Sequence, residues 1–81
     1  MQNDEYQIAF LTIHDMLRNR ESFSFDEIQD RILEKGGVLY VAFGTTIGQY
    51  IIMLENNGAI AFNPITERYD VKLEIQRAQA I

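Results

Sequence analysis

The sequence contains no cysteine, one proline, one histidine and only seven basic side chains. Without cysteine, disulfides, thiolate nucleophiles and zinc–thiolate sites are excluded, and so are the small secreted scaffolds that disulfides hold together. A single histidine excludes His-rich metal sites. Near the N-terminus, Asp4 and Glu5 stand where an export signal would carry basic residues. We therefore expect a cytoplasmic protein, or a nuclear one if the source is eukaryotic.

Long hydrophobic runs are also lacking, although 47% of the 81 residues are hydrophobic. The longest weakly charged stretch, residues 38–54, contains Gly44, Thr45, Thr46 and Gly48. It is too short and too polar for a membrane span, so we expect no membrane partner. A chain of this length has room for one hydrophobic core. We expect a single domain over residues 1–81, with its core within residues 5–72.

The spacing of apolar residues predicts three helices. Residues 5–19 place one apolar stripe on a first helix, made of Tyr6, Ala9, Phe10, Ile13, Met16 and Leu17. Ser24 and Glu27 form a capping box at the start of a second helix, which ends at Gly36 and Gly37. A third helix is predicted from Thr45 or Thr46 to Asn57. Its core-facing residues are Ile47, Tyr50, Ile51 and Leu54.

Two further stretches have the composition of β-strands. Residues 38–43 are β-branched and aromatic, which fits either a strand or the lead-in to the third helix. In residues 59–62 and 68–72, apolar side chains alternate with small or charged ones. These two stretches flank a turn at Asn63 and Pro64, and this pattern predicts a β-hairpin. Residues 73–81 are expected to form a short C-terminal helix or to fray. The fold class is therefore α+β, with three helices and a C-terminal hairpin.

The third helix is predicted to end in the sequence Leu54-Glu55-Asn56-Asn57-Gly58-Ala59-Ile60. This ending, with the order of three helices and a hairpin, resembles the winged helix-turn-helix superfamily over residues 5–72. The resemblance implies a small winged-helix-like domain with a recognition helix at 45–57 and a wing at 59–72. Residues 36–44 depart from that pattern, because this connection is longer and more apolar than the usual turn.

Positive charge is missing where a DNA-reading helix would need it. Between Gly36 and Thr66 the only charged side chain is Glu55. Contacts to phosphate supply much of the affinity for DNA, so this gap disfavours nucleic acid as a partner. The DNA-binding alternative that the resemblance implies would rely on Lys35, Thr45, Thr46, Gln49, Arg68 and Lys72.

The same stretch has features of a protein interface. Thr45, Gly48 and Ile52 follow one another at helical spacing away from the core stripe, with Met53 beside them. Glycine inside a helix costs about 1 kcal/mol relative to alanine, so Gly48 suggests close approach by a partner. Surfaces with few charges and apolar anchors are typical of interface centres. The predicted interface residues are Thr45, Gly48, Ile52, Met53, Ile8 and Leu11.

A plainer interpretation stays open for part of this set. Exposed aliphatic residues are common on monomeric proteins. Ile8 and Ile52 would then be covered by the C-terminal segment or by residues 38–43.

We expect no catalytic residues, no cofactor and no metal ion. His14 has no plausible nucleophile beside it, and we interpret it as structural or solvent-exposed. The first functional hypothesis is a non-enzymatic winged-helix interaction module that binds a protein partner or forms a homodimer. A winged-helix DNA-binding transcriptional regulator is the alternative. An acidic inhibitor of a nucleic-acid-binding protein is a third, minor one, since the net charge is −5.

Overall fold

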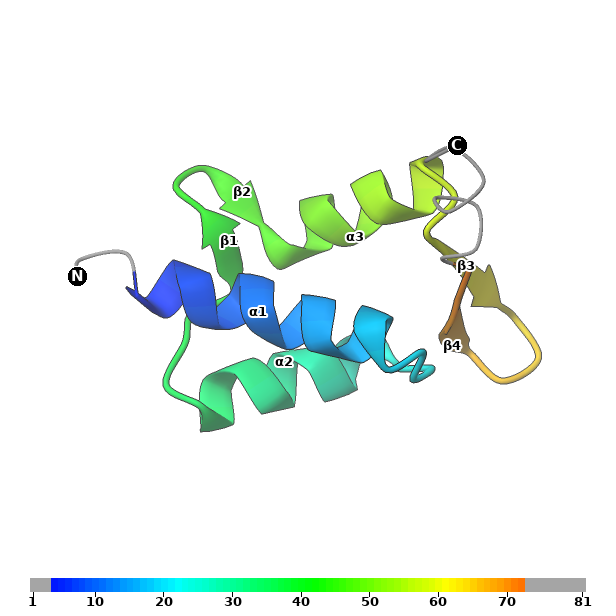
Figure 1. The fold of residues 1–81 in the computed structure, drawn as a ribbon, viewed down its shortest axis with the longest axis horizontal. Helices are drawn as coiled ribbons and strands as arrows, with labels where there is room; N and C mark the ends of the chain where they lie inside the picture. The colour runs from blue at the N-terminus through cyan, green and yellow to red at the C-terminus, as the bar shows by residue number, and fades with distance from the viewer. Residues whose placement is uncertain (1–3, 73–81) are drawn as a thin grey trace.

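Residues 4–72, which the computed structural model describes, form three helices and two antiparallel hairpins. In chain order the elements are α1 (Asp4–Arg18), α2 (Phe25–Glu34), β1 (Tyr40–Ala42), β2 (Thr45–Thr46), α3 (Ile47–Asn56), β3 (Ile60–Asn63) and β4 (Arg68–Val71). Figure 1 shows the two hairpins toward opposite ends of the molecule. The α+β class is confirmed, and the arrangement is compatible with a small winged-helix-like domain. The predicted C-terminal helix or frayed tail lies outside the described residues.

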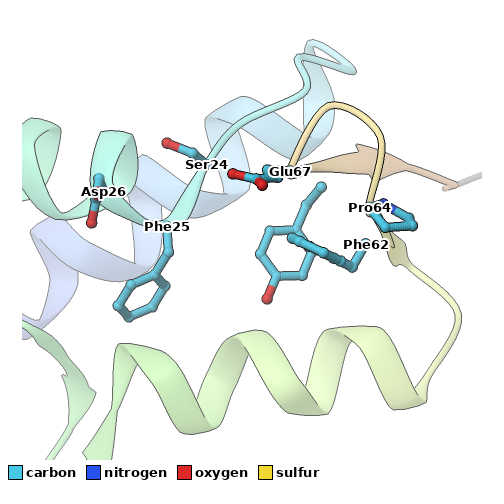
Figure 2. A pocket seen from close by; sticks show the side chains of 7 residues that line it. Ser24, Phe25, Asp26, Phe62, Pro64 and Glu67 are labelled. Atoms are coloured by element: carbon cyan, nitrogen blue, oxygen red, sulfur yellow. The ribbon is translucent and has the colours of Figure 1, made fainter.

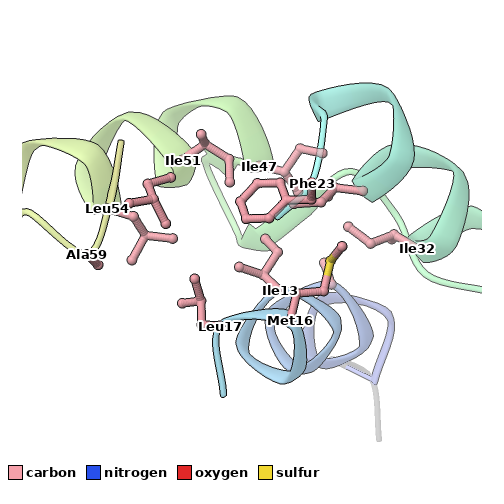
Figure 3. Close-up of a cluster of buried hydrophobic side chains, with 12 residues drawn as sticks. Ile13, Met16, Leu17, Phe23, Ile32, Ile47, Ile51, Leu54 and Ala59 are labelled. Atoms are coloured by element: carbon pink, nitrogen blue, oxygen red, sulfur yellow. The ribbon is translucent and has the colours of Figure 1, made fainter. Parts of the chain in front are cut away.

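The hydrophobic core lies where the three helices meet (Figure 3). Its members from α1 and α2 are Ala9, Ile13, Met16, Leu17, Ile28 and Ile32. The rest of the chain adds Phe23, Ile47, Ile51, Leu54, Ala59 and Ile60. The predicted apolar stripe of the first helix is wrong at Phe10, whose side chain is 39% exposed. Thr12, a polar residue outside the predicted stripe, is buried.

The predicted ends of α2 are confirmed. Ser24 is the N-cap, and its hydroxyl oxygen accepts a hydrogen bond of 3.1 Å from the Glu27 amide. At the other end, Gly36 adopts a left-handed conformation with φ of +87°. The Gly36 and Gly37 amides donate to the carbonyl groups of Leu33 and Ile32, which satisfies the last turn of the helix.

Residues 40–42 form strand β1, which decides between the two interpretations of that stretch. Its partner is β2, only two residues long, with Ala42 opposite Thr45 and Tyr40 opposite Thr46. The assignment of Thr45 to the third helix is therefore wrong. Thr46 is the N-cap of α3, so the helix itself begins at Ile47.

The connection from α2 to β1 passes very close to α1. A Cβ atom placed on Gly37 would lie 2.8 Å from Cγ2 of Ile8 and 2.9 Å from Cγ2 of Ile32. Real Cβ atoms essentially never approach that closely, so a larger residue at position 37 would force the Ile8 or Ile32 side chain to shift. Ile8 is consequently half-buried at the point where Gly37 crosses α1.

The C-terminal hairpin is joined to the chain between α1 and α2. Strands β3 and β4 pair in regular register, with Phe62 opposite Tyr69, and Pro64 lies in the turn as predicted. Phe23 forms an additional antiparallel bridge to Tyr69. Two backbone hydrogen bonds make this bridge, from Phe23 N to Tyr69 O at 3.1 Å and from Tyr69 N to Phe23 O at 2.7 Å. The hairpin is therefore fixed beside the start of α2.

Substituting Gly37 tests the crossing of α1. We expect Gly37→Ala to lower the free energy of unfolding by about 1–3 kcal/mol, because the new methyl group overpacks the contact with Ile8 and Ile32. Urea denaturation of Gly37→Ala, Ile8→Ala and the double variant measures this effect. The double variant should lose less than the two single losses added together, since Ile8→Ala makes room. Strict additivity would contradict the steric explanation.

Candidate interaction surfaces

The outer face of α3 exposes two large apolar side chains next to each other in sequence. Ile52 is 56% exposed and Met53 is 50% exposed. The only charged residue in the helix is Glu55, and neither its first nor its last turn carries a charge that complements the helix dipole. The sequence predicted both side chains on this surface, and the structure places both there.

Among the other predicted interface residues, Gly48 lies on α3 one turn from Ile52, whereas Thr45, Ile8 and Leu11 lie on other elements. Thr45 lies in β2 and is half-buried, and Ile8 is covered at the Gly37 crossing. Leu11 is 51% exposed, but it lies on α1. The row Thr45, Gly48 and Ile52 is therefore interrupted at its first member, because a short hairpin replaces the start of the helix.

Gly48 packs against the protein's own Phe25. A Cβ atom at Gly48 would lie 3.7 Å from Cζ of Phe25, which is ordinary van der Waals contact. Alanine would therefore fit at this position. Glycine is less favourable than alanine inside a helix, and packing within the chain does not explain why glycine is present. Side chains three or four residues apart are neighbours on a helix, so Ile52 lies on the Gly48 side of α3 and Met53 on the Tyr50 side.

An aromatic cluster connects α1 to α3 on the Tyr50 side. The ring centroids of Phe10 and His14 are 4.2 Å apart, and each lies 5.9 Å from that of Tyr50. His14 Nε2 is 2.6 Å from the Tyr50 hydroxyl oxygen, so the two groups share a hydrogen bond. Burial lowers the pKa of the His14 imidazole below its usual value, and the positive charge of Arg18 adds to this effect. His14 thus packs between Phe10 and Tyr50 and joins α1 to α3.

Arg68, one of the cations of the DNA-binding alternative, is engaged within the fold. Its guanidinium donates to both carboxylate oxygens of Glu27, at 2.9 and 3.2 Å. It also donates to the Ser22 hydroxyl at 3.1 Å and to the Ser22 carbonyl at 2.9 Å. The hydrogen bond from the Arg68 side chain is the main reason why the pKa of the Glu27 carboxyl is lowered. Of the predicted capping box, the bond from the Glu27 amide to the Ser24 hydroxyl is present. The Glu27 carboxylate accepts hydrogen bonds from Arg68 in place of the Ser24 amide.

Two other residues of the DNA-binding alternative cap α3. The Gln49 side-chain oxygen accepts a hydrogen bond of 2.9 Å from the Thr46 amide, and the Gln49 amide donates to the Thr46 hydroxyl at 3.1 Å. The Thr-x-x-Gln spacing in the sequence is a signal from which this box could have been predicted. Lys35 and Lys72 are exposed, but they follow α2 and β4, whose ends lie on opposite sides of the molecule (Figure 1). The structure does not bring the six residues together.

An open pocket of about 500 Å³ lies between the start of α2 and the C-terminal hairpin. Its apolar walls are Phe25, Phe62, Pro64 and Tyr69, and its polar lining residues are Ser24, Asp26 and Glu67. Figure 2 shows Phe25 on one side of the space and Phe62 on the other. No pattern in the sequence indicates this pocket, because its walls come from segments almost forty residues apart.

Among residues 4–72, no three side chains of the metal-binding types gather closely enough to hold an ion. None of the helices within that range has the length and apolar character needed to cross a membrane. Comparisons with protein-family models, with curated proteins and with solved structures found no match to this chain.

The His14 cluster makes stability depend on pH. Folding lowers the pKa of His14, so the unfolded chain takes up the proton first as the pH falls. We expect the free energy of unfolding to decrease as the pH falls below about 6.5, the ordinary value for histidine. Urea denaturation above and below this pH, with His14→Gln as the comparison, measures the effect. An equal loss in His14→Gln over this window would assign it to other groups.

Removing Arg68 should loosen the hairpin. We expect Arg68→Ala to lower the free energy of unfolding by roughly 1 kcal/mol, the upper end for solvent-exposed ion pairs. Glu27→Gln should act through the same bonds, so a double-mutant cycle should show coupling between the two positions. Because the folded pKa of Glu27 is lowered, this contribution should be lost as the pH falls below about 4.5. Lys72→Ala is the control, and a cycle without coupling would contradict the assignment.

Proposed function

We propose that this protein is a non-enzymatic, winged-helix-like interaction module that acts through protein–protein contacts. The form we propose is self-association through the outer face of α3. The observation that carries the proposal is the pair Ile52 and Met53, each at least half exposed on a helix whose only charged residue is Glu55.

Burial of this pair would supply the main favourable term for association. Complete burial of an aliphatic or methionine side chain contributes roughly 1.5–3 kcal/mol relative to full exposure. Few charged groups would have to lose water at the same time, because Glu55 is the only one on the helix. An 81-residue chain has a small core, so a partner that binds the folded state also raises its stability.

The charge distribution supports a protein partner over nucleic acid. Helix α3 contains no Lys or Arg, and Thr46 and Gln49 are occupied in capping it. Arg68 is bonded to Glu27 and Ser22. A groove-binding helix in this state would gain little from the phosphate contacts that dominate affinity for DNA.

Charge introduced on α3 should disrupt association. We expect sedimentation velocity over a range of protein concentrations to show a dimer for the wild type. Ile52→Asp and Met53→Asp should shift it to the monomer, because each places a carboxylate in an apolar contact. Leu33→Asp is the matched control, since Leu33 is an equally exposed residue, at 53%, on α2. Circular dichroism checks that all three variants fold.

Two results would overturn the proposal. One is a wild-type protein that stays monomeric at all concentrations, or variants that dimerise as the wild type does. The other is tight binding to mixed-sequence duplex DNA with a steep dependence on salt. That dependence would indicate release of counterions from phosphates and would favour the DNA-binding regulator.

A further inference from the structure

The pocket beside the hairpin has aromatic walls that the fold holds in place. Phe62 is 45% exposed, and its ring lies edge-on to that of Tyr69, with centroids 5.2 Å apart. The other neighbour of Tyr69 is Phe23, stacked at 5.4 Å and completely buried. On the opposite wall, the Phe25 ring rests against Gly48 of α3. Both walls are therefore held by contacts within the fold, and the pocket is present without a ligand.

The charge around the pocket is negative. Asp26 and Glu67 line it, and neither carboxylate forms a hydrogen bond or ion pair within residues 4–72. No Lys or Arg is among the described lining residues, and the nearby Arg68 is already bonded to Glu27. The positive end of the α2 dipole does not reverse this sign, because Asp26 and Glu27 both lie in its first turn.

We propose that this pocket binds an arginine side chain from an extended segment of a partner protein. The guanidinium would enter between Phe25 and Phe62, where aromatic faces attract a cation. Asp26 or Glu67 would accept hydrogen bonds from its outer edge. A volume of about 500 Å³ is sufficient for an arginine and part of the flanking backbone.

Arginine fits this site better than lysine. Its planar guanidinium stacks on aromatic rings while it donates to a carboxylate, whereas an ammonium group is more strongly hydrated and does not stack. The open shape of the pocket suits an extended chain that runs across it, with Pro64 and Ser24 at its edges. This site does not include Ile52 or Met53, so the inference goes beyond the proposed self-association.

The test is a titration of the ¹⁵N-labelled full chain with the peptide acetyl-Ala-Pro-Arg-Pro-Ala-amide. Saturable shifts are expected at the amides of Phe25, Phe62 and Tyr69. The same peptide with citrulline in place of arginine should bind about tenfold more weakly, since citrulline keeps the shape and lacks the charge. Equal binding of the two peptides would overturn the proposal, and so would the absence of shifts at the pocket.

Variants of the protein locate the site. We expect Phe62→Ala and Glu67→Lys each to weaken the arginine peptide by about tenfold. The matched controls are Phe43→Ala, an 89% exposed phenylalanine at the tip of the other hairpin, and Glu34→Lys at the end of α2. Both should bind as the wild type does. Glu67 lies in an exposed turn, so Glu67→Lys remains informative if Phe62→Ala fails to fold.

Two further variants separate this inference from its alternatives. Ile52→Asp should keep the wild-type affinity for the peptide, whether or not it changes the oligomeric state. A several-fold gain in affinity in Arg77→Gln would identify the chain's own Arg77 as the occupant and would overturn the proposal. Unchanged affinity in that variant supports a separate partner.

Discussion

The pairing of Phe23 with Tyr69 is the constraint on which the rest of the structure depends. Two backbone hydrogen bonds join these residues, and the Phe23 ring is completely buried and stacked on Tyr69. The chain between α1 and α2 is thereby tied to the hairpin that follows α3. With Tyr69 fixed, Arg68 reaches Glu27 and Ser22. Arg68, the first residue of β4, is thus bonded within the fold, and less positive charge is left for a partner.

The parts of the fold that the sequence predicted are those governed by local rules. The cap at Ser24 and the helix end at Gly36 could be predicted, because each depends only on residues within one turn of α2. Strand β2 was missed because two residues carry no periodicity. The error at Phe10 has a similar origin, since an apolar stripe shows that a helix has a buried side but does not show how far it extends.

The candidate sites were less predictable, because they depend on residues far apart in the chain. Ile52 and Met53 were found, since exposure opposite a core stripe follows from helical spacing. The bond between Arg68 and Glu27 spans 41 positions, and no pattern in the sequence links the two. The pocket was missed for the same reason, since Phe25 and Phe62 come together only through the hairpin's attachment at Phe23.

Gly48 lies between the two surfaces and helps to explain why they stay distinct. It is one turn from Ile52, and it contacts the Phe25 ring that forms a wall of the pocket. A glycine in a helix costs about 1 kcal/mol relative to alanine. A methyl group there would meet no atom closer than 3.7 Å, so the fold alone does not require the glycine. Because Gly48 carries no side chain, it adds no apolar group between Ile52 and the Phe25 wall of the pocket, so the two surfaces stay separate.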